Sequence, residues 1–202
     1  MGVSFIFQYN LNGDSSKEGM EFIHNSLIKA GAILYNLFSI ECEIYHSIAN
    51  PSHTKIIYNF ALSDFANTTF SIVESSNNIN LLLADKSYEL FFSKLTYHGF
   101  SKKLPKIECK GSSYKIKDIL VKPGIVTFGT NFKGILIQID YFPSSIPSSC
   151  LNLVKEFITE ILGNNNISPL PLYLNNRMND LFTPSDIVHQ YLEYFNLFKK
   201  NV

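Results

Sequence analysis

The sequence predicts an α+β fold: one large antiparallel β-sheet, closed or nearly closed into a barrel, flanked by about four helices. Two observations predict this class. About nine short β-rich runs are separated by turn residues, several of them at the spacing of an antiparallel meander, and only about four stretches show apolar residues at helical spacing. Closure into a barrel is expected because it removes exposed strand edges. A length of 202 residues suits a single barrel-like domain spanning residues 1–202.

The N-terminal half predicts a strand, a helix, four strands and a short helix, in that order. Residues 4–9 alternate apolar and polar side chains, which is typical of a strand with one buried face. Ser15 and Glu18 form a capping-box pair that starts the helix, and Gly31 suits its end. The four further strands are residues 32–46, 55–62, 68–74 and 79–84. Asp85 is expected to cap the short helix that follows.

The C-terminal half predicts four more strands and then a helix. Gly111, Pro123 and residues 129–131 are turn signals that separate these strands. The strands are residues 107–110, 114–122, 125–128 and 134–141. Ser148 or Ser149 is expected to cap the helix.

The last helix is the best candidate for a binding surface. It follows residues 163–181, an asparagine-rich segment predicted to be an ordered surface connector or a flexible loop, and it starts at Thr183 and Pro184. Its apolar residues spread over roughly 160° of the helical wheel, wider than a core-facing stripe. This helix and the first strand supply the predicted partner-interface residues: Phe5, Phe7, Tyr9, Tyr191, Tyr194 and Phe198. An equally weighted interpretation places the helix in a groove of its own domain.

The charge balance favours neither nucleic acid nor a membrane as partner. Seventeen Lys and Arg residues match seventeen Asp and Glu residues, so no overall field attracts an anionic surface. Residues 102–122 are locally rich in lysine and could dock an acidic segment or nucleic acid, although solvated lysines that protect strands are the more ordinary interpretation. Without arginine there, no sequence-specific nucleic-acid binding is expected. No apolar run approaches ~20 residues, so no membrane span is expected.

Glu41 and Glu43 are the sharpest candidates for chemistry. Both carboxylates lie on one face of a predicted strand, as in the Glu-x-Glu-x-Lys strand with which triphosphate-tunnel hydrolases bind metal. Tyr45 stands where that lysine belongs, and the chain has one arginine, Arg177, to offset a triphosphate's charge. We therefore expect no catalytic residue. A metal-dependent triphosphate phosphohydrolase using Glu41 and Glu43 is the alternative.

Cysteine and histidine spacing predicts no metal site and no cofactor. In a strand, Cys42 and His46 would lie about 13 Å apart at ~3.3 Å per residue, too far to share one ion with His53. The cysteines, Cys42, Cys109 and Cys150, lack CxxC spacing and predict buried, reduced thiols in an intracellular protein.

Six segments, spread in order over most of the chain, carry a family resemblance. They are MGVSFIFQ, ECEIYHS, LLLADKSYELFFSKL, DILVKPGIVTFG, KGILIQIDY and DIVHQYLEYFNLF. The most specific is DILVKPGIVTFG, residues 118–129, followed closely by KGILIQIDY. Together these segments resemble the Mediator complex subunit 20 family.

The resemblance implies a nuclear, non-enzymatic subunit of the Mediator head module, built on a β-barrel flanked by helices. It implies direct pairing with Mediator subunit 18 and contact with the C-terminal segment of Mediator subunit 8. The head supports assembly of RNA polymerase II and of general factors, including the TATA-binding protein, so these partners are expected to be indirect. Besides the phosphohydrolase, a barrel that carries a hydrophobic ligand is an alternative. Residues 163–181 depart most from the family, so no interaction is mapped there.

Overall fold

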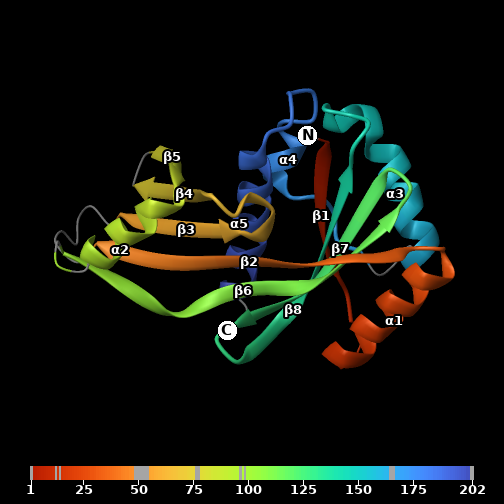
Figure 1. The fold of residues 1–202 in the computed structure, drawn as a ribbon, viewed down its shortest axis with the longest axis horizontal. Helices are drawn as coiled ribbons and strands as arrows, with labels where there is room; N and C mark the ends of the chain where they lie inside the picture. The colour runs from red at the N-terminus through yellow and green to blue at the C-terminus, as the bar shows by residue number, and fades with distance from the viewer. Residues whose placement is uncertain are drawn as a thin grey trace. The chain divides into compact units, whose positions relative to one another are not determined.

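The computed structural model describes residues 2–200 except residues 12, 14, 48–54, 76–77, 96, 98 and 164–166. The described part of the chain confirms the predicted α+β class (Figure 1). The strands are β1 (Val3–Tyr9), β2 (Ile33–Ser47), β3 (Ile56–Leu62), β4 (Thr68–Ser75), β5 (Asn78–Asp85), β6 (Phe100–Ile116), β7 (Ile119–Phe128) and β8 (Asn131–Tyr141). The helices are α1 (Ser16–Lys29), α2 (Glu89–Leu95), α3 (Pro147–Leu162), α4 (Leu172–Asn175) and α5 (Pro184–Lys200), with 3-10 turns η1 (Ser63–Phe65) and η2 (Lys86–Tyr88).

The strands form an eight-stranded sheet in the order β1-β8-β7-β6-β2-β3-β4-β5. The described chain forms two compact units. Unit 1 contains residues 2–38, 110–126 and 132–200, and unit 2 contains the described residues of 39–109 together with 127–131. Strands β2, β6, β7 and β8 each contribute residues to both units, so the units are described separately below. The single-domain expectation stays a prediction.

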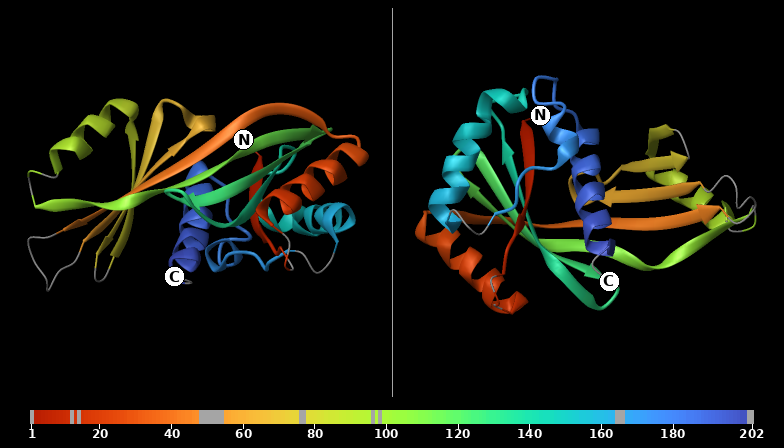
Figure 2. Two further views of the ribbon diagram at one scale, coloured as in Figure 1. Left: turned by 90° about the horizontal axis from the view of Figure 1, so that it is seen from below. Right: turned by 180° about the vertical axis from the view of Figure 1, so that it is seen from behind.

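The sheet is open, which corrects the predicted barrel. Among the described strands, the order ends at β1 and β5, and these two do not pair with each other. Helix α5 lies beside β1 (Figure 2), and its side chains bond the backbone groups along the outer edge of that strand. The Ile6 N–H donates to Gln190 Oε1 at 3.1 Å, and Gln190 Nε2 donates to the Ser4 carbonyl at 3.1 Å. The Tyr194 hydroxyl donates to the Ile6 carbonyl, also at 3.1 Å. Helix α5 thus covers the outer edge of β1, so closure into a barrel is not needed to remove that exposed edge.

The asparagine-rich connector covers the remainder of this edge. The Ser168 N–H donates to the Gln8 carbonyl at 2.9 Å, and the Gln8 N–H donates to Ser168 Oγ at 2.8 Å. Ile167 forms an antiparallel bridge with Tyr9, and Leu174 of α4 is buried. In its described part the segment is therefore a surface connector with defined contacts, the first of the two predicted forms.

Two predicted turns lie inside strands, so residues 107–128, predicted as three strands, belong to two strands of the described chain, β6 and β7. Gly111 lies in β6 and Pro123 in β7. A methyl group added at Gly111 would overlap the Pro123 carbonyl oxygen, which shows that this glycine permits a close approach of two backbones. The actual reversal occurs between Ile116 and Ile119, where Lys117 adopts a positive φ of 50°.

Helix α1 begins as predicted, because both hydrogen bonds of the Ser15–Glu18 capping box are present. The start of α3 was predicted wrongly. Its N-cap is Ile146, without a side-chain capping bond, and Pro147 follows within the first turn. Asp85 accepts the Ser87 N–H at 2.8 Å and so begins η2, ahead of α2.

Each unit has its own apolar core. In unit 1, helix α5 packs against β1, and α1 contacts α3 (Figures 1 and 2). In unit 2, helix α2 covers one face of the strands through a cluster of Tyr45, Ile57, Phe92 and Leu95. The Tyr45 and Phe92 rings stack with centroids 5.2 Å apart. Among the described helices, none is long and apolar enough to cross a membrane.

Candidate partner interface

The six predicted interface residues are all buried within unit 1. Their side chains are at most 5% exposed; they are Phe5, Phe7, Tyr9, Tyr191, Tyr194 and Phe198. The arc of apolar residues on α5 is wide because the helix packs against both β1 and α4 of its own unit. This burial supports the competing interpretation, that α5 serves the core. The role of these six residues in a partner interface stays a prediction.

A buried polar network explains why Tyr191 points into the core. Lys122 Nζ lies 2.6 Å from Asp140 Oδ2, and the side chains of this pair are only 4% and 10% exposed. Asp140 Oδ1 accepts Gln138 Nε2 at 2.7 Å, and the Tyr191 hydroxyl donates to Gln138 Oε1 at 2.9 Å. Three of the six resemblance segments therefore meet in one place, through β7, β8 and α5. Such a network favours a single arrangement of these elements.

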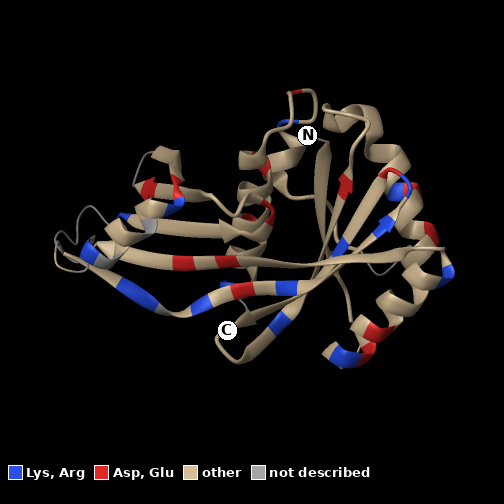
Figure 3. Cartoon of the chain, viewed as in Figure 1, with Lys and Arg blue, Asp and Glu red and all other residues tan. Residues whose placement is uncertain are grey.

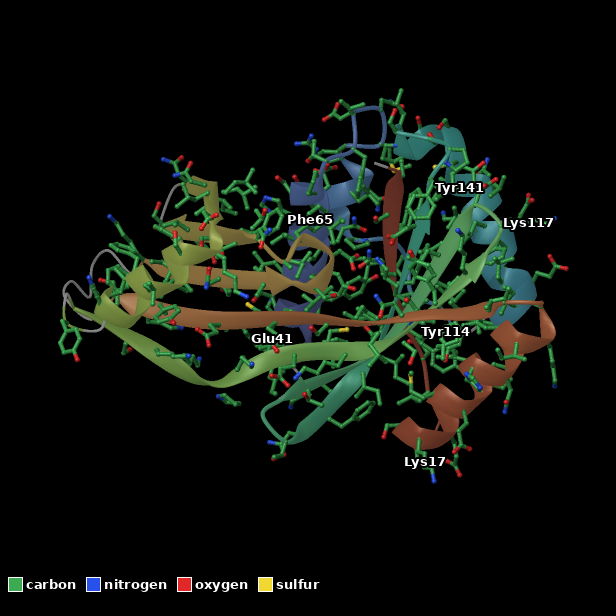
Figure 4. The ribbon with its side chains drawn as sticks, viewed as in Figure 1. Lys17, Glu41, Phe65, Tyr114, Lys117 and Tyr141 are labelled. Atoms are coloured by element: carbon green, nitrogen blue, oxygen red, sulfur yellow. The ribbon has the colours of Figure 1, made fainter. Side chains whose placement is uncertain are left out.

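The Glu41 and Glu43 carboxylates belong to ion pairs in unit 2. Glu43 Oε1 accepts Lys102 Nζ at 2.6 Å, and the Tyr45 hydroxyl donates to Glu43 Oε2 at 2.8 Å. Glu41 Oε2 accepts Lys106 Nζ at 2.9 Å. Figure 3 shows these acidic positions of β2 beside basic positions of β6, and Figure 4 labels Glu41. Three of the carboxylate oxygens thus have cationic or hydroxyl partners within the chain, which favours the interpretation of a solvated strand face over that of a metal site.

The pKa values in this pair follow from the same contacts. Burial raises the pKa of Glu43, but hydrogen bonds from Lys102 and Tyr45 outweigh burial and hold it below 4.5. Burial, followed by the Glu43 carboxylate, raises the pKa of Tyr45 well above its usual value. The phenol at the position of the hydrolase lysine therefore stays neutral and donates a hydrogen bond. Its chemistry differs from that of a cation that binds phosphate.

The described part of the chain shows no metal site among the cysteine and histidine candidates. No group of three or more His, Cys, Asp or Glu residues in the described part of the chain could hold an ion, and His53 lies outside that part. Cys42, Cys109 and Cys150 are buried thiols outside any disulfide, as predicted. Burial raises the pKa of the Cys109 thiol, so this thiol stays protonated at neutral pH.

An exposed apolar strand, missed by sequence reasoning, is the best interface candidate. In the first part of β2, which we call the edge segment (residues 33–37), Ile33, Tyr35 and Leu37 are 72%, 64% and 74% exposed, and Leu34 is also exposed. Successive residues point to opposite faces of a strand, so apolar side chains meet solvent on both faces. The signal was the sequence ILYNL itself, which lacks the apolar and polar alternation of residues 40–46.

Unit 2 carries a second exposed apolar surface. Ile79, Leu82 and Leu83 of β5 and Phe91 of α2 are at least 43% exposed. Strand β5 is the last strand in the sheet order of the described chain, and an apolar strand at a sheet edge is a template for association. Both units therefore present apolar surface of the kind that partner proteins cover.

Comparison with known proteins identifies the family. The family model described as "TATA-binding related factor (TRF) of subunit 20 of Mediator complex" matches residues 1–196. Mediator of RNA polymerase II transcription subunit 20 of Aedes aegypti is 32% identical over 209 residues, covering 99% of this chain and 95% of its own length. The Homo sapiens protein of the same name is 31% identical over 206 residues, with the same two coverages.

A conserved hypothetical protein of Pyrococcus furiosus has a similar fold. The TM-score is 0.50 at 15% identity, and the match covers 87% of this chain and 99% of that one. At this identity the likeness concerns the fold alone. The function follows from the family model and from the relatives that match nearly end to end: the chain belongs to the Mediator subunit 20 family, a family of non-enzymatic subunits of the RNA polymerase II Mediator.

Proposed function

We propose that this chain acts in the nucleus by forming a heterodimer with Mediator subunit 18, supported by contact with the C-terminal segment of Mediator subunit 8. Its contribution to transcription is assembly of the head module. Polymerase II and the TATA-binding protein are then reached through the assembled head, and the chain needs no cofactor, catalytic group or sequence-specific contact with nucleic acid.

The exposed edge segment is the observation that carries this proposal. Side chains such as Ile33 and Leu37, each more than 70% exposed, leave apolar area in water that a partner would remove. Full burial of a side chain of this size stabilises by about 1.5–3 kcal/mol, so several of them suffice for a strong contribution to binding. The family's place in a multi-subunit module supplies such a partner.

The balance of charge supports the same view. The chain carries no net charge at pH 7, and a neutral protein with exposed apolar strands gains solubility when a partner covers them. A permanent or nearly permanent complex is therefore expected.

The test is light scattering on the chain purified alone and co-expressed with subunit 18 and the C-terminal segment of subunit 8 from the same organism. We expect poor solubility alone and a stable equimolar complex after co-expression. A monodisperse monomer that binds neither protein would contradict the proposal.

Matched variants locate the interface. Ile33→Ser with Leu37→Ser should weaken the complex at least about tenfold, the equivalent of ~1.4 kcal/mol. Leu172→Ser with Leu181→Ser removes leucines of similar exposure, 71% and 65%, elsewhere in unit 1 and should leave binding unchanged. Equal effects of the two pairs would show that general surface hydrophobicity, rather than the edge segment, drives association.

A further inference from the structure

Alternate backbone groups of the edge segment point away from β6, in addition to its exposed side chains. The Asn36 N–H donates to Ser113 Oγ of β6 at 3.0 Å, and the Asn36 carbonyl accepts the same hydroxyl at 2.8 Å. Since the backbone groups of neighbouring residues in a strand point to opposite sides, those of Ile33 and Tyr35 point away from β6. The registered pairs of β2 with β3 begin only at Ile40. In the described chain, no strand pairs with residues 33–37 on that side.

Part of this edge is guarded by the chain itself. Asn36 Oδ1 accepts the Leu37 N–H at 2.8 Å, so one outward donor has a local partner. The contrast with β1 is informative, because there Gln190 and Tyr194 occupy the outer backbone groups. Within unit 1, the β1 edge is covered by α5, while the edge at Ile33 and Tyr35 is left for another molecule.

The positive charge beside the edge segment indicates the sign of the charge that a binding partner carries there. Lys115 Nζ lies 5.9 Å from the centre of the Tyr35 ring, and Lys117 lies at the turn between β6 and β7, where Figure 4 labels it. Among the described carboxylates, none forms an ion pair with Lys115. A second copy of this chain would bring a second Lys115 ammonium to the joint, which is repulsive. A carboxylate of the partner beside Lys115 would instead be attracted to its ammonium group.

From this geometry we infer the mode of binding: an extended strand of the partner adds to β2 along residues 33–37, with apolar side chains on both faces and a carboxylate beside Lys115. This inference rests on the proposed heterodimer with subunit 18 and specifies how its interface forms. Backbone hydrogen bonds to Ile33 and Tyr35 align the added strand, and the side chains on both faces give it area.

The test measures Kd by titration of the complex of subunit 18 and the subunit 8 segment into variants of this chain. Tyr35→Pro removes an outward N–H that an edge strand can lose without harm to its own sheet, and Tyr35→Ala is the matched control that keeps the N–H. Strand addition predicts that Tyr35→Pro binds at least about tenfold more weakly than Tyr35→Ala. If the two variants bind equally while the wild type still binds, strand addition is refuted but the proposed heterodimer is not. Absence of wild-type binding overturns the proposed function itself.

A charge reversal provides an independent comparison, which decides alone if Tyr35→Pro does not fold. Lys115→Glu should weaken binding several-fold and reduce its dependence on salt. Lys103→Glu, another exposed lysine of β6, should leave both unchanged. Equal effects of the two reversals would refute the carboxylate beside Lys115. A dimer of the isolated chain that Tyr35→Pro abolishes would instead assign the edge to self-pairing.

Discussion

Removal of the Asp140 carboxylate should deprive a buried ammonium group in unit 1 of a carboxylate partner. Lys122 is almost fully buried and 2.6 Å from Asp140. In Asp140→Ala its charge loses this carboxylate while staying out of water. Breaking a buried pair in this way costs about 3–5 kcal/mol. For a chain of about 200 residues, 1 kcal/mol lowers Tm by ~2–4 °C, so the expected fall is roughly 6–20 °C.

The double variant Lys122→Met with Asp140→Leu should recover most of that loss. It removes both charges and their desolvation together, and it leaves Gln138 Nε2 without the acceptor it has at 2.7 Å, a cost of about 1–3 kcal/mol. The two single substitutions should therefore be strongly non-additive in a double-mutant cycle.

Urea unfolding followed by circular dichroism measures all four corners of the cycle. Glu21→Ala is the control, because Glu21 pairs with Lys17 at 3.9 Å with side chains 63% and 86% exposed, and such pairs contribute at most about 1 kcal/mol. A single-variant loss no larger than that of the control, or simple additivity, would refute the role assigned to the network.

Three further predictions concern stability. Glu43→Gln should lose at most about 1 kcal/mol of folding free energy at pH 7. Because hydrogen bonds from Lys102 outweigh burial and lower the pKa of Glu43, the difference in stability between wild type and variant should disappear as the pH falls below 4.5. Urea unfolding of both proteins across pH 3–7 checks the sign. Gly111→Ala should cost about 2 kcal/mol or more in thermal unfolding, since the methyl overlaps the Pro123 carbonyl; an unchanged Tm would remove the close-approach explanation. Phe198→Ala should cost about 3–5 kcal/mol, and a binding defect at unchanged stability would return this residue to the interface.

Local signals in the sequence predicted the elements whose causes are local. The capping box of Ser15 and Glu18 is complete within four residues, so α1 was predicted at its true start. Gly111 was misinterpreted because a glycine marks either a turn or a close approach of two backbones, and only the position of Pro123 decides between them. The open sheet depends on Gln190 reaching β1, a contact 184 residues away along the chain that no local pattern encodes.

The interface could not be predicted from the hydrophobic arc for a related reason. Aromatic residues such as Tyr194 look like binding residues on a helical wheel, yet its hydroxyl bonds to a strand edge, and burial raises its pKa to about 12. The wide arc arises because α5 packs against both β1 and α4. Residues 33–37 carry the opposite signal, apolar side chains on both faces of a strand, because the apolar and polar alternation of β2 begins only at Ile40.

Hydrogen exchange of the backbone amides tests the central claim most directly. The amides of Ile33 and Tyr35 are compared in the chain alone and in its complex with subunit 18 and the subunit 8 segment, with the Gln8 amide, already bonded to Ser168, as an internal reference. We predict fast exchange of both edge amides in the free chain and strong protection in the complex, with Gln8 unchanged. A stable complex in which Ile33 and Tyr35 exchange as fast as in the free chain would contradict it.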